Sequence, residues 1–105
     1  MNDILAKIGD TGIVPVVVLN KVSDAEPLAQ ALINGGLPCA EVTFRTDAAE
    51  ASIAAISKKF PEMFVGAGTV LTTEQVDRAV GAGAKFIVSP GFNPKVVEYC
   101  LKKGY

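Results

Sequence analysis

Residues 39–46 read CAEVTFRT, and this stretch decides between the folds that the rest of the chain allows. Side chains two positions apart lie on the same face of a β-strand. As a strand, the stretch places Glu41, Thr43 and Arg45 on one face and apolar residues on the other. The neighbouring segments are typical of parallel strands buried on both faces, so we expect this polar row to line an interior. A buried acid beside a fixed cation is a candidate chemical site.

Outward from this stretch, the chain repeats a strand followed by a helix four times, after a short opening helix. The predicted strands cover residues 13–19, 39–46, 64–70 and 86–89. Each following helix has a candidate N-cap, and these residues are Ser23, Asp47, Thr72 and Asn93. Alternating strands and helices predict βα units around a parallel sheet.

Two architectures fit four such units: an open α/β sandwich, or half of an eight-unit TIM-type barrel. An open sheet has helices on both faces, whereas a barrel interior tolerates polar residues. The polar row favours the barrel, and so do Gly66 and Gly68, which leave room inside. A complete barrel needs about 200 residues or more. We therefore expect an α/β fold in which residues 1–105 are the N-terminal half of a barrel domain: a short N-terminal helix and four consecutive βα units.

Composition narrows the function classes. Half of the 105 residues are hydrophobic, the net charge is −1 and histidine is absent, which predicts a compact fold without a histidine-based triad. With no basic stripe and no long apolar run, neither nucleic acid nor a membrane is an expected partner. The start of the chain is unlike a signal peptide. Cys39 and Cys100 are expected to be reduced core residues of a cytoplasmic protein, and no metal site is expected.

Three polar residues at predicted strand ends are candidates for chemistry, and each has a simpler interpretation. Glu41 could be a general acid or base, or could form a structural ion pair with Arg45. Arg45 could grip a carboxylate or phosphate, or be a surface residue. Thr69 could donate a hydroxyl to the same anion, or be a turn residue before a helix cap. Gly66 and Gly68 give only a weak nucleotide signal, because a third glycine at the required spacing is missing.

Four motifs in register resemble the bacterial KDPG/KHG aldolases: IVPVV at 13–17, EVTFRT at 41–46, VGAGTV at 65–70 and SPG at 89–91. That family cleaves 2-keto-3-deoxy-6-phosphogluconate and 4-hydroxy-2-oxoglutarate to pyruvate and an aldehyde. The resemblance implies a class I, metal-free aldolase without a cofactor, on an α/β barrel that usually forms a homotrimer. By this resemblance, Glu41 would transfer protons and Arg45 would hold the pyruvyl carboxylate of the substrate. Thr69 would lie beside Arg45, and Pro90 would line the pocket.

The resemblance also implies that a part is missing. The family's Schiff-base lysine lies on the sixth strand, in a segment that these residues do not include. We therefore expect aldolase activity from the full-length protein and none from these residues alone. Two alternatives stay open: a stand-alone half-barrel that acts as a binding or assembly module without catalysis, and a flavodoxin-like nucleotide module.

Overall fold

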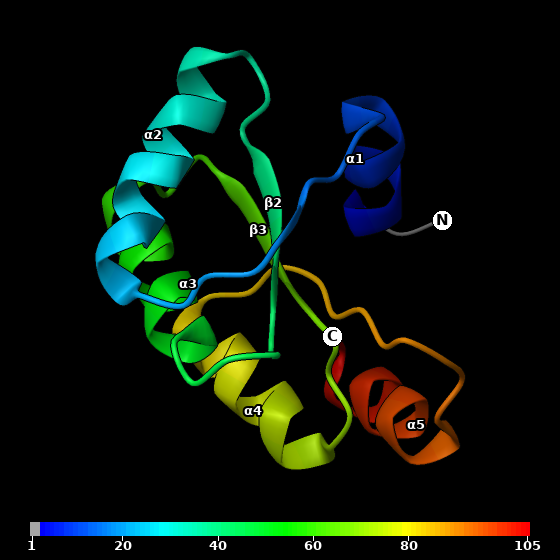
Figure 1. Cartoon of the computed structure of the whole chain (residues 1–105). Coiled ribbons are helices and arrows are strands. Elements are labelled where there is room, and N and C mark those ends of the chain that lie inside the picture. Colours follow the sequence, from blue (N-terminus) through cyan, green and yellow to red (C-terminus); the bar gives the residue numbers. More distant parts are fainter. Residues whose placement is uncertain (1–2) are drawn as a thin grey trace.

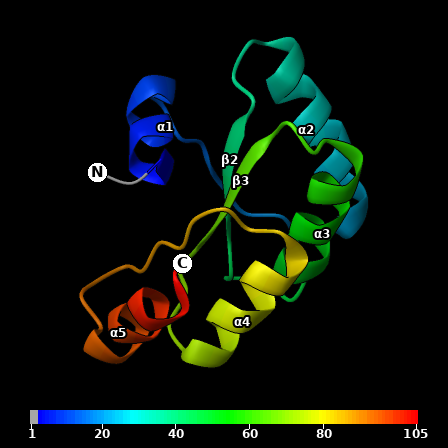
Figure 2. The same ribbon diagram turned by 180° about the vertical axis from the view of Figure 1, so that it is seen from behind.

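The computed structural model describes residues 3–105, which form a parallel sheet with helices on both sides (Figure 1). The strands lie in the order β1 (Val16–Val17), β2 (Cys39–Thr43) and β3 (Phe64–Gly68). The helices are α1 (Asp3–Thr11), α2 (Ala25–Asn34), α3 (Ala49–Lys59), α4 (Thr73–Ala82) and α5 (Pro94–Lys103), with a 3₁₀ turn η1 (Val22–Asp24). Helices α2, α3 and α4 lie together on one side of the sheet and α1 lies on the other, as the view from behind also shows (Figure 2). The expected α/β class with a parallel sheet is confirmed.

The predicted fourth strand at residues 86–89 is present only as a single parallel bridge between Ala67 and Ile87. The Ala67 N–H donates to the carbonyl of Phe86 at 2.9 Å, and the Val88 N–H donates to the carbonyl of Ala67 at 2.8 Å. The segment therefore lies beside β3, where a fourth strand was expected, but its regular pairing is shorter than the sequence indicated.

The prediction for residues 13–19, a strand buried on both faces, is wrong in length and in burial. Only Val16 and Val17 pair with β2, and Val16 is 60% exposed. Pro15 has no N–H to donate, although its carbonyl accepts the Glu41 N–H at 2.8 Å. Helices cover only the Val17 face of this edge strand, so the opposite face stays open.

The main core lies between the sheet and helices α2, α3 and α4. Val42 and Val65 project from the sheet against Ile53 and Ile56 of α3, and all four side chains are at most 1% exposed. Burying an aliphatic side chain of this size contributes about 1.5–3 kcal/mol. This face holds the sheet and its helices together.

A second, smaller cluster covers the beginning of the other face. Cys39, Phe64 and Phe86 are buried there, with Ile4 and Ile8 of α1 packed against them. The rings of Phe64 and Phe86 have centroids 5.0 Å apart. Helix α1 thus covers the N-terminal ends of β2 and β3 and leaves their C-terminal ends uncovered. Both cysteines are free thiols, as expected, although Cys100 is only half-buried.

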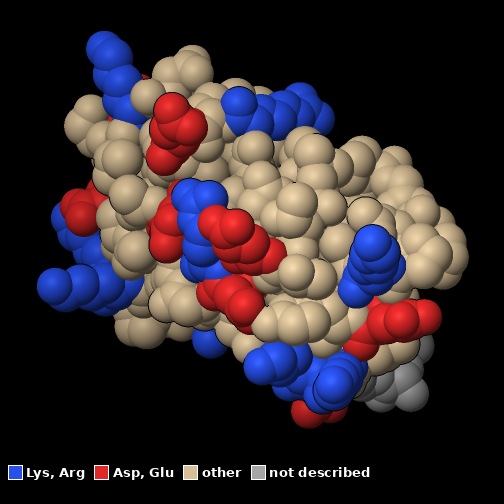
Figure 3. Space-filling view, turned by 90° about the horizontal axis from the view of Figure 1, so that it is seen from below, with Lys and Arg blue, Asp and Glu red and all other residues tan. Residues whose placement is uncertain are grey.

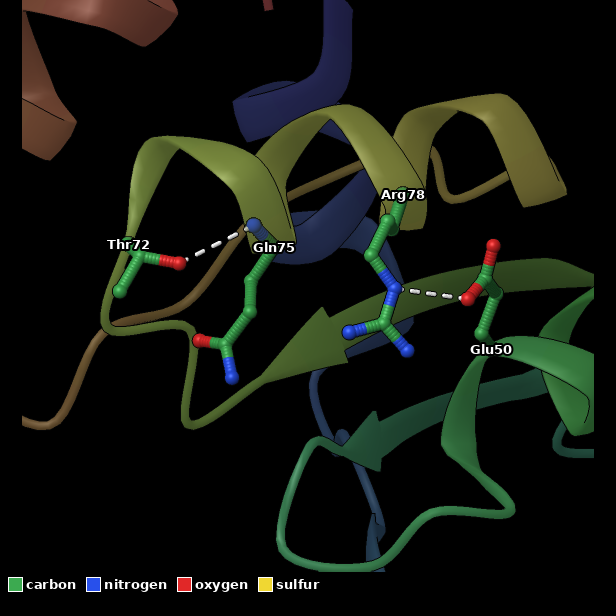
Figure 4. A network of polar contacts seen from close by, with 4 residues as sticks. All are labelled: Glu50, Thr72, Gln75 and Arg78. Atoms are coloured by element: carbon green, nitrogen blue, oxygen red, sulfur yellow. Dashed lines mark hydrogen bonds and ion pairs between the residues drawn. The ribbon is translucent and has the colours of Figure 1, made fainter.

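Two of the four predicted helix caps are confirmed. The Thr72 hydroxyl accepts the Gln75 N–H at 3.1 Å at the start of α4 (Figure 4). The Asn93 side-chain oxygen accepts the Lys95 N–H at 3.1 Å, and Pro94 occupies the first turn of α5. Each side chain satisfies a backbone donor that the helix itself cannot pair.

The other two predicted caps are wrong. Ser23 lies within η1, and α2 begins at Ala25 without a side-chain cap. Asp47 does not cap α3, because Ala48 occupies the N-cap position and its N–H donates to the Thr46 hydroxyl at 3.3 Å. In both cases a turn just before the helix takes the place of the expected cap.

A surface ion pair links α3 to α4. The Arg78 Nε lies 2.7 Å from the Glu50 carboxylate (Figure 4), and the Arg78 guanidinium lies over the ring of Phe44 at 5.6 Å from its centroid. Exposed pairs of this kind are worth about 0–1 kcal/mol. Through these two contacts, Arg78 connects α4 both with α3 and with the turn that follows β2.

Candidate active site

The register of the sheet sets which side chains meet on the face opposite α2–α4. Glu41 is paired with Gly66, and Thr43 is paired with Gly68. Paired residues of parallel strands share a face, so the side chains of Glu41 and Thr43 project over two glycines. The polar row therefore faces away from the main helices, on the side where α1 covers only the beginning of the strands.

Glu41 fills the space that Gly68 leaves. A Cβ atom on Gly68 would overlap the Glu41 carboxylate, and one on Gly66 would overlap the ring of Phe86. Glu41 is half-buried, and burial raises the pKa of its carboxyl, while the Arg45 charge opposes that rise. A carboxyl with a raised pKa exchanges its proton closer to neutral pH, which suits general acid–base work.

Arg45 lies in the turn after β2 and not on the strand, because β2 ends at Thr43; the prediction of a continuous strand through Arg45 is wrong. The turn still brings Arg45 to Thr69, whose hydroxyl accepts the Arg45 Nε–H at 3.3 Å. Thr69 itself has a left-handed backbone (φ +55°), which is uncommon for a residue other than glycine. Non-glycine residues in this region are often found at functional sites.

Backbone and hydroxyl contacts hold this turn on both sides. The Phe44 N–H donates to the carbonyl of Gly68 at 2.7 Å, on the β3 side. On the β1 side, the Thr43 hydroxyl donates to the carbonyl of Val17 at 3.1 Å, and the Thr46 hydroxyl donates to that of Leu19. Thr43 is fully buried and is committed to this structural contact.

Thr46 is a positioning residue to which the sequence argument gave no role. Its hydroxyl donates to Leu19 and accepts from Ala48, so it closes the turn that carries Arg45. A threonine followed closely by a helix start was the available signal, since Ser and Thr hydroxyls commonly bond backbone groups nearby.

Pro90 is exposed in the bend after the Ile87 bridge. The hydroxyl of Ser89 donates to the carbonyl of Val70 at 2.7 Å, and the Val70 N–H donates to the carbonyl of Val88 at 3.1 Å. These bonds join the end of β3 to the segment that leads into Pro90. Pro90 therefore lies near the same end of the sheet as Thr69. Among the interactions described for residues 3–105, Pro90 has no direct contact with Glu41, Arg45 or Thr69.

A large apolar hollow of the described chain lies away from these polar residues. It is an apolar groove of about 530 Å³ between α1, residues 85–92 and α5, and neither Glu41 nor Arg45 lines it. The chemistry-bearing side chains and this apolar groove are therefore separate features. We assign the candidate site to the polar residues because burial raises the pKa of the Glu41 carboxyl there and the Arg45 guanidinium lies nearby on the open face of the sheet.

The surface carries no single-sign field on the face that Figure 3 shows, where acidic and basic side chains are interspersed. Within residues 3–105, no helix combines the length and the apolar character that crossing a bilayer requires.

Comparison with known proteins reveals close similarity over nearly the whole chain. The family model described as KDPG and KHG aldolase matches residues 4–104. A 2-dehydro-3-deoxy-phosphogluconate aldolase of Treponema pallidum is 58% identical over 92 residues, which are 88% of this chain and 44% of that protein. The KHG/KDPG aldolase of Escherichia coli K12 is 45% identical over 82% of this chain and 40% of its own length. The chain thus spans less than half the length of these curated relatives.

Solved structures agree with this similarity. The KDPG aldolase of Zymomonas mobilis ZM4, determined with 3-phosphoglycerate, superposes with a TM-score of 0.91 at 39% identity, covering 99% of this chain and 49% of that one. The KDPG aldolase of Legionella pneumophila, in which pyruvate was captured as a covalent carbinolamine, gives a TM-score of 0.81 at 40% identity, covering 85% and 43%.

Proposed function

Because the chain belongs to the KDPG and KHG aldolase family, we propose that it is the N-terminal half of a class I aldolase barrel. The full-length protein would cleave 2-keto-3-deoxy-6-phosphogluconate or 4-hydroxy-2-oxoglutarate to pyruvate and an aldehyde. Residues 1–105 would supply four of eight βα units, with α1 covering the lower end of the barrel. The expected homotrimer and cytoplasmic location belong to this proposal for the full-length protein.

The observation that carries the proposal is the half-buried carboxyl of Glu41 on the open face of the sheet, beside Arg45. Imine formation between an amine and a keto group needs several proton transfers, and a carboxyl with a raised pKa can perform them. Arg45, with Thr69 accepting its Nε–H, would hold the pyruvyl carboxylate through the remaining guanidinium N–H groups. Pro90 would line the same pocket at the exit of the fourth unit.

The nucleophile has to come from outside these residues. Every lysine of the chain is exposed, so none is the buried amine that we expect for the Schiff-base nucleophile. The carbinolamine captured in the Legionella relative supports this type of chemistry, because a carbinolamine forms when an amine adds to a keto group. In the proposed reaction, Glu41 delivers and removes the protons, and Arg45 keeps the keto acid in register.

Two measurements test the proposal. The full-length protein that carries this sequence should release pyruvate from 2-keto-3-deoxy-6-phosphogluconate, and Glu41→Gln should lower kcat by roughly 10²–10⁴-fold. The 105-residue chain alone should form no borohydride-trapped adduct with pyruvate. Trapping an adduct on the 105-residue chain would contradict the assignment of the nucleophile, and a fully active Glu41→Gln enzyme would contradict the role of Glu41.

A second candidate function, an assembly module without catalysis, is favoured by one specific feature: large apolar side chains are exposed at both edges of the sheet. That feature leads to a distinct inference about the isolated chain.

A further inference from the structure

The first of two exposed apolar surfaces is the groove beside α5. Ile8 of α1, Val88 and Phe92 line it on one side, and Val97 and Leu101 of α5 line it on the other. Phe92 is 81% exposed and Leu101 is 73% exposed. Surface aromatic and aliphatic side chains are ordinary when single, but a contiguous groove of them marks an interaction site.

The second surface is the β1 edge, defined by Ile13, Val16 and Val18, which are 67%, 60% and 45% exposed. It lies at the opposite end of the sheet order from the bridge at Ile87. The two surfaces together contain most of the large exposed apolar side chains of the described residues, so their placement is not scattered.

The backbone at both edges is available for pairing. In a parallel ladder, one residue can hydrogen-bond to both chain neighbours of the residue opposite it. The opposite residue then points its own N–H and C=O away from that strand, toward the free edge. Ala67 makes both bonds of the bridge, with Phe86 and Val88, so Ile87 directs its backbone groups outward. Glu41 bonds Pro15 and is paired with Val16, so Val16 directs its groups outward at the other edge. Unprotected edges of this kind favour association.

We propose that two copies of this 105-residue chain associate about a twofold axis parallel to the strands. The β1 edge of each copy pairs with residues 85–89 of the other, and its apolar side chains enter the partner's α5 groove. A rotation about that axis keeps all strands parallel, so each new pairing has the same sense as those already in the sheet. Both contacts form at once, and a closed dimer leaves no sheet edge free.

Length supports a second copy as the occupant. The solved relatives that superpose on this chain are about twice as long, since it covers 43% and 49% of two of them. A second copy supplies a comparable number of residues to the same open edges. The proposal does not depend on the aldolase assignment, because neither surface contains Glu41, Arg45 or Thr69.

Sedimentation of the isolated chain over a wide range of concentrations tests the proposal. The expected species is a dimer with twice the chain mass. Val16→Lys at the β1 edge and Leu101→Lys in the groove should each raise the dimer dissociation constant by at least roughly tenfold, because each places a charge in an apolar contact. Leu71→Lys is the matched control, since Leu71 is 52% exposed but lies outside both surfaces and should leave the dimer intact.

Circular dichroism separates loss of the dimer from loss of the fold, and Val18→Lys replaces Val16→Lys where the latter variant is unfolded. A monomer at every concentration overturns the proposal. Dimers that Leu101→Lys weakens but the β1-edge variants do not would also overturn it, because groove-to-groove contact would then explain the association. Open-ended oligomers would contradict the twofold closure.

Discussion

At the scale of single residues, Gly66 and Gly68 have different tasks although they share a strand and a face. A Cβ on Gly66 would meet the ring of Phe86, which is fixed in the small core, whereas one on Gly68 would meet the flexible end of Glu41. A rigid ring cannot yield without repacking, but a carboxylate can swing away. Gly66 is therefore needed for the packing of the core, and Gly68 is needed for the position of the Glu41 side chain.

This difference predicts two contrasting alanine variants. Gly66→Ala should destabilise the chain by about 1–3 kcal/mol, the usual cost of overpacking. Gly68→Ala should cost less than about 1 kcal/mol but move Glu41 into solvent, which lowers the pKa of its carboxyl toward the ordinary value. Denaturant unfolding and an NMR titration of Glu41 measure the two effects. Gly81→Ala in α4 is the control and should be neutral or stabilising, because a Cβ there meets open space. Equal stability losses at Gly66 and Gly68 would contradict this division.

The raised pKa of Glu41 predicts that its charge destabilises the fold at neutral pH. For a carboxyl whose folded-state pKa exceeds its unfolded value of about 4.3, the folded state binds more protons between the two values, so stability falls as pH rises through them. Glu41→Gln should therefore be more stable than the parent chain at pH 7, and the difference should vanish below the unfolded pKa. Urea unfolding at both pH values measures this, with the exposed Glu62→Gln as control. A Glu41→Gln variant that is less stable at pH 7 would mean that the attraction between the Glu41 carboxylate and the Arg45 charge outweighs burial.

Residue-level reasoning from the sequence predicted which face carries Glu41, and that Arg45 and Thr69 would lie near one another. It could do so because alternation along a strand and the shared edge of parallel strands are local rules. It did not predict that Arg45 leaves the strand, or that Thr46 holds the turn. Both depend on hydroxyl contacts with the carbonyls of Val17 and Leu19, more than twenty residues away in the chain.

At the scale of elements, cap prediction succeeded where the residue before the helix is extended and failed where it is not. Thr72 and Asn93 have extended backbones and cap their helices, whereas Asp24 and Ala48 are in the helical region. An extended N-cap points its side chain back at the first free N–H groups, and a helical one cannot. Sequence spacing alone does not reveal this dihedral, which the preceding turn determines.

Two substitutions test this explanation of the caps. Thr72→Ala should destabilise the chain by about 1 kcal/mol, because an N–H of α4 loses its acceptor. Ser23→Ala should change stability by less than about 0.5 kcal/mol, although its sequence context is equally typical of a capping box. Thermal unfolding of both variants measures the comparison. A similar loss for both variants would show that Ser23 caps α2 in solution after all.

The length of the strands follows from their position in the sheet. The central strand β2 has neighbours on both sides and runs over five residues, whereas β1 and the 86–89 segment each bond one neighbour and pair over one or two residues. The sequence pattern predicted where the four paired segments lie along the chain. It could not predict the extent of pairing, because that depends on what lies at the outer edge.

At the scale of the whole molecule, the chain combines the candidate site at Glu41 and Arg45 with exposed lysines and two open sheet edges. The same edges would accept a second copy of this chain or the C-terminal half of a family member. In the proposed function, a C-terminal segment that carries a buried lysine and closes both edges would supply the nucleophile. These two occupants compete, because each needs the β1 edge and the α5 groove.

This competition predicts a complementation experiment. On the proposed function, the separately produced C-terminal half of the Treponema pallidum relative should bind the 105-residue chain, reduce its dimer fraction and restore pyruvate release from 2-keto-3-deoxy-6-phosphogluconate. Neither half should be active alone.

Glu41→Gln in this chain should leave the complex intact but lower its turnover by roughly 10²–10⁴-fold, since only proton transfer is impaired. Leu101→Lys should instead weaken the complex and leave the turnover per complex unchanged, because neither Glu41 nor Arg45 lines the α5 groove. A well-formed complex that stays inactive with the parent chain would argue that Glu41 and Arg45 do not form the acid–base and carboxylate side of an aldolase site.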